Sequence, residues 1–199
     1  ACSSLLLKKR FKTKVTKSGY ERELFILLCN LYIQQNKFSE VLDYVFTLYV
    51  RTGEIKYITN LKDKIPLAQW HQQYYSQIEK KLLLDSTLKP SIILSLYQIE
   101  KKWDEQIHFL HMHQDIQLLN SVAPDLYKNR KKDFEVLYTG AIIRYLENHL
   151  GDFSYAYLDT QFRILDNNRL FALKAFVKER IKAMYKEREG LIKYLITNI

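Results

Sequence analysis

Apolar side chains recur at intervals of three and four residues along most of this chain. Between residues 20 and 35 the apolar positions are Leu24, Phe25, Leu28, Leu31 and Tyr32, and between 39 and 53 they are Val41, Leu42, Val45, Phe46 and Tyr49. This is the period of an α-helix that buries one face. We expect Ser39 to cap the second helix and Gly53 to end it. The pattern therefore predicts two antiparallel helices with a short joint.

The same period continues toward the C-terminus and predicts further helices. Pro66 and Pro90 fit the first turns of two of them, and another begins at Trp103. Pro124 is expected to interrupt the next helix, and Asp152 to cap a later one. The remaining helices are predicted at about 133–151, 152–168, 169–186 and 187–198. Since no segment alternates apolar and polar residues long enough to indicate a strand, we expect an all-α fold.

One pattern recurs along the sequence at unequal intervals. Tyr32, Phe38, Val41 and Val45 are matched 65 residues later by Tyr97, Trp103, Gln106 and Leu110, and more loosely a further 50 residues on by Phe153 and Ala156. Helical hairpins repeated in this way predict an irregular superhelix of antiparallel hairpins, a type of α-α solenoid. We expect residues 1–19 to be a basic arm or frayed helix and residues 20–199 to be one helical-repeat domain, with a subdivision near 125–132 left open.

The first hairpin resembles a tetratricopeptide repeat. Its large, small and aromatic packing positions correspond in order to Leu28, Cys29, Tyr32, Val41, Val45 and Leu48. The chain departs from the family pattern where Cys29 replaces glycine or alanine, Val41 replaces alanine and Gly53 stands at a common proline position. The resemblance covers about 35 residues. It implies a helical scaffold that binds a protein or peptide partner.

The C-terminal part is similar to the helical tail of bacterial SWIM zinc-finger proteins. The residues that carry this similarity are Tyr145, Leu146, Gly151, Phe162, Tyr185, Arg188, Leu191 and Leu195. The paired cysteines and histidine of the zinc finger have no counterpart here, so the resemblance assigns neither zinc nor DNA binding to any residue. It implies that the chain is a fragment or accessory region of a larger protein.

Composition narrows the class of protein. Only five glycines and three prolines leave little turn chemistry for a many-stranded β fold. The longest apolar runs fall far short of the roughly 20 residues of a membrane span. Two cysteines, Cys2 and Cys29, form neither a disulfide framework nor a metal motif, which favours a reducing compartment and a cytoplasmic location. A lipid anchor on Cys2 is the alternative.

Positive charge is concentrated near the ends of the chain, whose net charge is +9. Residues 1–20 hold six basic and no acidic side chains. The basic patch predicted further on consists of Lys128, Arg130, Lys131, Lys132, Lys174, Lys178, Lys182 and Lys186. The last four are spaced four apart, which predicts a stripe on one helix, opposite Leu170, Leu173, Val177, Ile181 and Met184. Such a stripe is either solvated surface or a site for an acidic partner or phosphate.

Candidate chemistry is sparse. His108 and His111 can share a helix face, but His113 lies off it and no further ligand has suitable spacing, so no metal site is predicted. Asp152, Asp159 and Asp166 recur every seven residues, which suits a solvated edge better than acid–base catalysis. Glycine-rich phosphate loops and nucleophile elbows are missing from the sequence. We therefore expect no enzymatic activity and no cofactor.

The sequence leaves two functional hypotheses. The first is a non-enzymatic scaffold that binds a protein or peptide in a groove lined by the inner helices of its hairpins, with Tyr32, Asn36 and Tyr44 as candidate contacts. The alternative is a nucleic-acid accessory module in which the basic arm and lysine stripe bind phosphates with steep salt dependence. Oligomeric state is left open.

Overall fold

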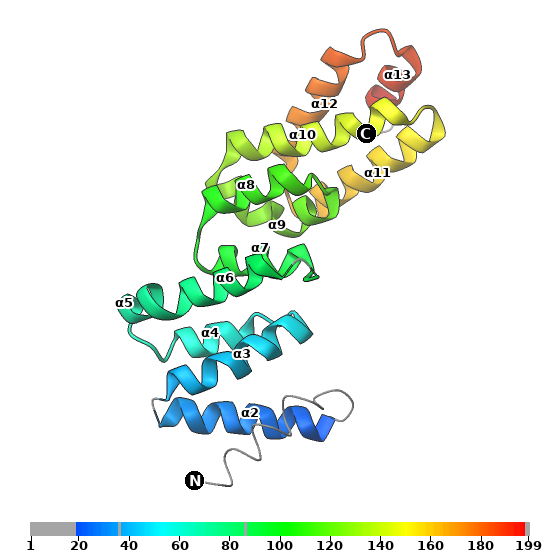
Figure 1. Ribbon diagram of the computed structural model, residues 1–199. Helices are drawn as coiled ribbons and strands as arrows, with labels where there is room; N and C mark the ends of the chain where they lie inside the picture. The colour runs from blue at the N-terminus through cyan, green and yellow to red at the C-terminus, as the bar shows by residue number, and fades with distance from the viewer. Residues whose placement is uncertain (1–18, 36, 86, 198–199) are drawn as a thin grey trace. The chain divides into compact units, whose positions relative to one another are not determined.

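The computed structural model describes residues 19–35, 37–85 and 87–197 of the chain, and all regular structure in these residues is helical (Figure 1). The all-α prediction is confirmed. The chain divides into two compact units, residues 1–92 and 93–199, and each is described by itself. The predicted single domain with a subdivision near 125–132 stays a prediction.

The first unit contains the predicted hairpin. Its elements are α2 (Gly19–Gln34), α3 (Phe38–Thr52), α4 (Lys56–Lys62), α5 (Leu67–Gln69), the π-helix η1 (Trp70–Tyr75), α6 (Ser76–Leu84) and the start of α7 (Pro90–Ile99). Helix α3 packs against both α2 and α4. Val41, Tyr49, Ile58, Leu61, Trp70 and Ile78 have no exposed surface. The apolar face predicted for the second helix is therefore the core of this unit.

The joint between α2 and α3 differs from the prediction by two residues. Lys37, not Ser39, is the N-cap, and the exposed Ser39 lies in the first turn of α3. The reason is a hydrogen bond from the Lys37 amide to the Tyr32 carbonyl (2.9 Å), which closes the preceding helix and makes Phe38 the first residue of the next. Gly53 ends α3 as predicted, with φ of 69° and its amide bonded to the Tyr49 carbonyl.

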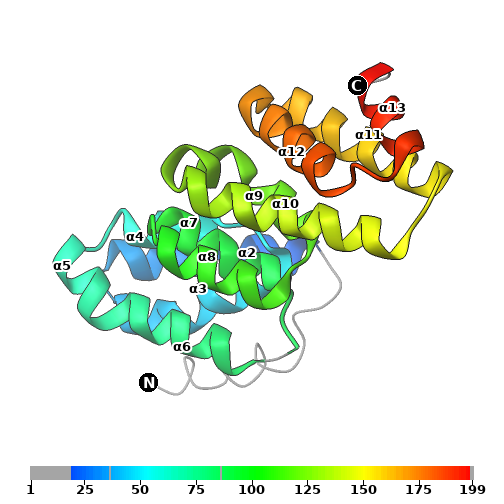
Figure 2. The ribbon, with the colours of Figure 1, turned by 90° about the horizontal axis from the view of Figure 1, so that it is seen from above.

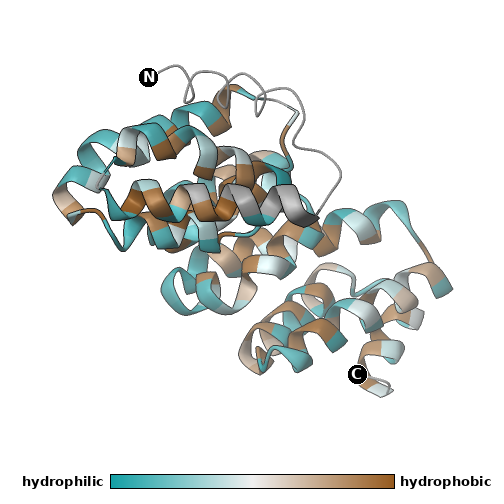
Figure 3. Ribbon diagram, turned by 90° about the horizontal axis from the view of Figure 1, so that it is seen from below, coloured by the Kyte–Doolittle hydropathy of each residue, from teal (hydrophilic) through white to brown (hydrophobic). Residues whose placement is uncertain are grey.

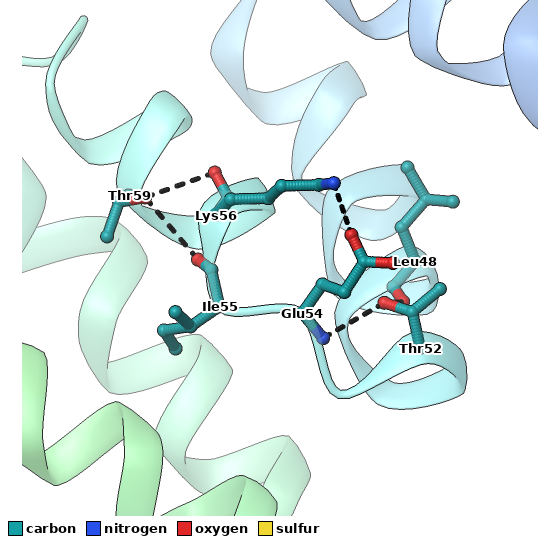
Figure 4. Close-up of polar contacts among 6 residues, drawn as sticks. All are labelled: Leu48, Thr52, Glu54, Ile55, Lys56 and Thr59. Atoms are coloured by element: carbon teal, nitrogen blue, oxygen red, sulfur yellow. Dashed lines mark hydrogen bonds and ion pairs between the residues drawn. The ribbon is translucent and has the colours of Figure 1, made fainter.

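Helix α4, which the sequence pattern did not predict, is fixed by polar contacts at its start (Figure 4). Thr52 donates its hydroxyl to the Leu48 carbonyl (2.8 Å) and accepts the Glu54 amide (3.0 Å). The carboxylate of Glu54 pairs with the ammonium of Lys56. These contacts hold the short segment between Gly53 and α4 in place. The helix that follows buries Tyr57, Ile58 and Leu61.

A π-helical turn interrupts the helix predicted from Pro66 to Lys81. Pro66 precedes the helix as its N-cap, and η1 separates α5 from α6. In an ordinary α-helix two residues five apart point in different directions, whereas the wider π turn brings them toward one face. Trp70, Tyr74 and Tyr75 are consequently all buried.

The second unit is built around one long helix. Its elements after α7 are α8 (Trp103–His113), α9 (Ile116–Asn129), α10 (Lys131–Asn148), α11 (Asp152–Asn167), α12 (Phe171–Met184) and α13 (Glu189–Thr197). Helix α10 packs against α8, α9, α11 and α12, and α13 packs on α12 (Figure 2). Hydrophobic and hydrophilic residues alternate along these helices (Figure 3), as amphipathic packing requires.

Contacts within this unit join alternate helices into two rows. In the first row, Gln98 of α7 bonds to Asp125 of α9, and Asn120 of α9 bonds to α11. Tyr155 of α11 stacks on Tyr194 of α13 with ring centroids 4.4 Å apart. Helices α8, α10 and α12 form the second row.

Two sequence predictions in this unit are wrong. Asp152 is the first residue of α11 and not its N-cap. The N-cap of α11 is Gly151, whose positive φ of 57° suits glycine. Pro124 lies inside α9 and does not interrupt it. A proline in a helix interior destabilises the helix by about 3 kcal/mol. Burial of each large apolar side chain stabilises the fold by about 1.5–3 kcal/mol, which offsets this cost. The buried side chains of α9 are Leu119, Val122, Ala123 and Leu126.

Candidate partner-binding surface

The hairpin of α2 and α3 brings two of the three predicted contact residues together. Tyr44 is half-buried, and burial together with the nearby Tyr32 raises the pKa of its phenol. Cys29 on α2 is buried, which raises the pKa of its thiol to about 12 and makes it a poor nucleophile. Asn36, Cys2 and the side chains of Phe25 and Leu28 lie outside the described residues. Tyr32 and Tyr44 thus share one region of the hairpin.

The basic residues around the joint of α9 and α10 are partly neutralised. Arg130 Nη2 lies 2.6 Å from an Asp104 carboxylate oxygen. Lys131 Nζ lies 3.9 Å from Glu135 Oε1. The side chains of Lys128 and Lys132 are exposed. Two of the four basic groups predicted here therefore face carboxylates rather than solvent alone.

The lysine stripe of α12 differs from the prediction. Lys174, Lys178 and Lys182 are half-buried beside the apolar face, because α12 packs against both α10 and α11. Lys174 pairs with Asp166 (2.7 Å). Burial and the two neighbouring lysines lower the pKa of Lys178.

The ends of the stripe also differ from the prediction. Lys182 pairs with Glu179 (3.0 Å). Helix α12 ends at Met184, so Lys186 lies beyond it and is not part of the stripe. Met184 itself is 57% exposed, whereas the pattern predicted it on the apolar face. The stripe is therefore shorter than the sequence indicated, and two of its three lysines on α12 pair with carboxylates.

A polar cluster joins three helices in the middle of the second unit. Asn120 Nδ2 of α9 donates to Gln161 Oε1 of α11 (2.9 Å), and the Tyr138 hydroxyl of α10 donates to Asn120 Oδ1 (2.8 Å). Tyr138 has no exposed surface and Gln161 is 5% exposed, whereas Asn120 is half-buried. Two buried partners therefore fix the orientation of an amide that reaches the surface.

The backbone next to this cluster has an unusual feature. Pro124 is four residues after Asn120, and because proline has no N–H, the Asn120 carbonyl lacks its intrahelical donor. Gln117, Ser121 and Pro124 are exposed on α9, and Lys128 follows one turn later. Asn120 thus offers its side-chain amide and its main-chain oxygen from one position. Of these residues, sequence reasoning singled out only Pro124 and Lys128, and the proline was the available signal.

The residues that resemble the SWIM-associated tail form structural contacts around the end of α10. The Tyr185 hydroxyl donates to the Ile143 carbonyl (3.3 Å), and Arg188 Nη1 donates to the Leu146 carbonyl (2.7 Å). Arg188 also lies over the Tyr185 ring, 4.4 Å from its centroid. Leu191 and Leu195 are the buried side chains of α13. The contacts of Tyr185 and Arg188 hold the segment between α12 and α13 against the end of α10.

Two pockets lie beside α13. One of about 160 Å³ is lined by Leu150, Gly151, Ser154, Tyr155, Arg188, Gly190 and Leu191. A Cβ at position 190 would lie 2.9 Å from the Tyr155 hydroxyl, so a larger residue than Gly190 would require the Tyr155 side chain to shift. A shallower one of about 300 Å³ runs along Lys186, Glu189, Ile192, Lys193, Ile196 and Thr197. In the first pocket the Ser154 hydroxyl donates to the His149 carbonyl (2.7 Å) and Arg188 Nη1 donates to the Leu146 carbonyl (2.7 Å), so these two polar groups are already engaged.

His108, His111 and His113 are exposed on α8, and the His113 ring lies against Phe109 with centroids 4.2 Å apart. Within the described residues, histidine, cysteine and carboxylate side chains form no group suited to a metal ion. No helix in that part of the chain combines the length and apolar character of a membrane span.

Comparisons with protein families, curated proteins and solved structures find no match to this chain.

Proposed function

We propose that this protein is a non-enzymatic helical-repeat scaffold that binds a protein or peptide partner. The observation that carries the proposal is a turn that recurs between pairs of helices. The amide before the second helix bonds to the carbonyl five residues earlier in Lys37 to Tyr32 (2.9 Å), Lys102 to Tyr97 (2.9 Å) and Leu170 to Leu165 (2.8 Å). An aromatic residue begins each second helix: Phe38, Trp103 and Phe171.

The backbone geometry of these turns is nearly the same. The capping residues have φ and ψ of −90° and 59° at Lys37, −84° and 72° at Lys102, and −92° and 48° at Leu170. A residue with positive φ precedes two of them, Lys101 at 54° and Arg169 at 58°. This turn supports an irregular superhelix of hairpins, with the third copy at 165–171 rather than around Phe153 and Ala156. Repeat proteins of this kind use extended surfaces to bind partners.

The exposed side chains of the first row of helices support a protein or peptide as the partner. On α9 they are largely uncharged and hydrogen-bonding, as in Gln117 and Ser121. The alternative, a nucleic-acid accessory module, requires free positive charge. Since Arg130, Lys131, Lys174 and Lys182 face carboxylates in the structure, we rank it second. Cytoplasmic location is part of the proposal.

A selection experiment tests the proposal. The chain is immobilised and exposed to a random peptide library displayed on phage, and enriched peptides are synthesised for titration. We expect saturable binding that changes little with salt. In parallel, duplex and single-stranded nucleic acids are titrated over a range of salt concentrations. Steeply salt-dependent nucleic-acid binding that is lost when Lys174, Lys178 and Lys182 are changed to Glu, with no peptide enriched, would overturn the proposal in favour of the alternative.

A further inference from the structure

We propose that Asn120 of α9 recognises the main chain of an extended peptide partner, using its side-chain amide and its own free carbonyl. This inference rests on the proposed function and names the contact through which that function is carried out. Peptide groups present one N–H donor and one C=O acceptor. Asn120 presents the complementary pair.

The side chain of Asn120 keeps hydrogen-bonding capacity that its neighbours do not use. One Nδ2 proton is used by Gln161 and one acceptor position of Oδ1 by Tyr138. An asparagine amide has two donor hydrogens and two acceptor positions, so one of each remains. Because both partners are at least nine-tenths buried and come from other helices, the amide is oriented before any ligand arrives. Such preorganisation reduces the entropy that binding costs.

The main-chain oxygen of Asn120 is the second group that a ligand can use. Pro124 removes the donor that would otherwise occupy the Asn120 carbonyl. An unpaired carbonyl inside a helix is unfavourable unless water or a ligand satisfies it. Proline 124 is exposed, so this side of α9 faces solvent and a ligand can approach. A peptide N–H satisfies this oxygen directly.

The side chains that α9 presents beside Asn120 bear on the kind of partner. The exposed Gln117, Ser121 and Pro124 carry no charge, whereas Asp125 and Lys128 further along the helix are charged. A peptide backbone lying extended along the helix can present both an N–H and a C=O to Asn120, and these two groups complement its free acceptor and donor. Recognition through the main chain tolerates many peptide sequences.

The test uses a peptide selected by the intact chain from a random library. Each of its peptide bonds is replaced in turn by an ester, which removes one N–H donor without a change in shape. At one position we expect about a tenfold loss of affinity for the wild-type chain, the effect of one hydrogen bond. Pro124→Ala restores an intrahelical donor to the Asn120 carbonyl. That variant should bind the parent peptide more weakly and be insensitive to the same ester.

A side-chain variant provides the second arm. Asn120→Asp keeps the acceptor for Tyr138 but loses both amide donors, the one that bonds to Gln161 and the free one, and we expect at least about a tenfold loss of affinity. Asn129→Asp is the matched control, because it makes the same change on the same helix at an exposed residue whose amide bonds to the Asp125 carbonyl (2.7 Å). It should bind as the wild type does. The ester series on the wild-type chain keeps the test valid if Asn120→Asp fails to fold.

The outcomes separate this inference from the function on which it rests. If the library yields no binding peptide, the proposed function fails and the inference with it. If peptides bind but neither the ester series nor Asn120→Asp changes their affinity, the scaffold function stands and the Asn120 inference is overturned. Loss of affinity in both arms, with Asn129→Asp unchanged, supports it.

Discussion

Two helices of the second unit differ in the hydrogen bonding of their backbone carbonyls. At the end of α10 the Tyr145 carbonyl lies 2.8 Å from the Nδ1 of His149. The Leu146 carbonyl accepts a hydrogen bond from Arg188 Nη1 (2.7 Å). In the middle of α9 the carbonyl of Asn120 loses its donor to Pro124. The first arrangement supplies partners to a helix end that lacks them. The second removes a partner where a helix would have provided one.

This difference separates stability from binding. At the end of α10 the carbonyls of Tyr145 and Leu146 are paired with side chains of the protein itself, and a pocket lies beside them. Residues around Asn120 are held by buried partners but keep unused hydrogen-bonding capacity on a half-exposed side chain. Natural proteins often lose stability where function requires it. The predictions below test whether the two helices divide in this way.

The largest effect is expected at the end of α10. Arg188→Ala removes a hydrogen bond from a charged donor and a cation–π contact with Tyr185, and should lower the free energy of unfolding by about 3 kcal/mol. Urea unfolding measures this change. Arg180→Ala is the control, since Arg180 is exposed and lies over Phe176 without such a hydrogen bond. Equal losses in the two variants would contradict a capping role for Arg188.

The next effect has the opposite sign. Pro124→Ala supplies the missing N–H within α9 and should raise the free energy of unfolding by about 2 kcal/mol, because the gain in helix propensity exceeds the lost rigidity of the unfolded chain. Pro90→Ala, at the first position of α7 where no helical bond is missing, should change stability little. Thermal and urea unfolding measure both. A destabilised Pro124→Ala variant would contradict the assignment of strain to α9.

A smaller effect is expected in the polar cluster. Tyr138→Phe removes the hydroxyl that bonds to Asn120 Oδ1 and should lower the free energy of unfolding by about 1 kcal/mol. It should also weaken peptide binding, because the Asn120 amide is then held by Gln161 alone. Tyr157→Phe is the comparison, since the Tyr157 hydroxyl makes no hydrogen bond among the described residues. A Tyr138→Phe variant that binds peptide as the wild type does would argue against preorganisation.

The smallest effect concerns high pH. Burial, with a contribution from Tyr145, raises the pKa of Tyr157 from 10.0 to about 12. The folded chain therefore holds this proton more tightly than the unfolded chain. Stability from this group is complete below about pH 10 and falls as the pH rises toward 12. The free energy of unfolding, measured across this pH range, should decline less steeply in Tyr157→Phe than in the wild type. An identical decline in both chains would contradict a raised pKa for Tyr157.

Much of the fold follows from the sequence because apolar periodicity records which face of a helix is buried. The hairpin from residue 20 to Gly53 and the helices after Pro90 were predictable for this reason. Helix starts at Lys37 and Gly151 were not, because backbone bonds and dihedral angles rather than capping side chains set them. The π turn at Trp70 was hidden because its residues still fit a helical spacing.

The candidate site was harder to predict than the fold. Asn120, Tyr138 and Gln161 come from three helices, and nothing local in the sequence indicates that their side chains meet. Pro124 was visible but was interpreted as a break in the helix. The ion pairs of the basic patch could not be predicted, because formal charge does not show that Asp104, Asp166 and Glu179 lie beside the basic groups.

The most direct test of this account is the NMR signal of side-chain amides during titration with a library-selected peptide. The account predicts that the amide resonances of Asn120 and Gln161 shift with saturable dependence on peptide concentration, while that of Asn148 at the end of α10 stays in place. Shifts confined to residues around Arg188 and α13, with Asn120 unchanged, would contradict it.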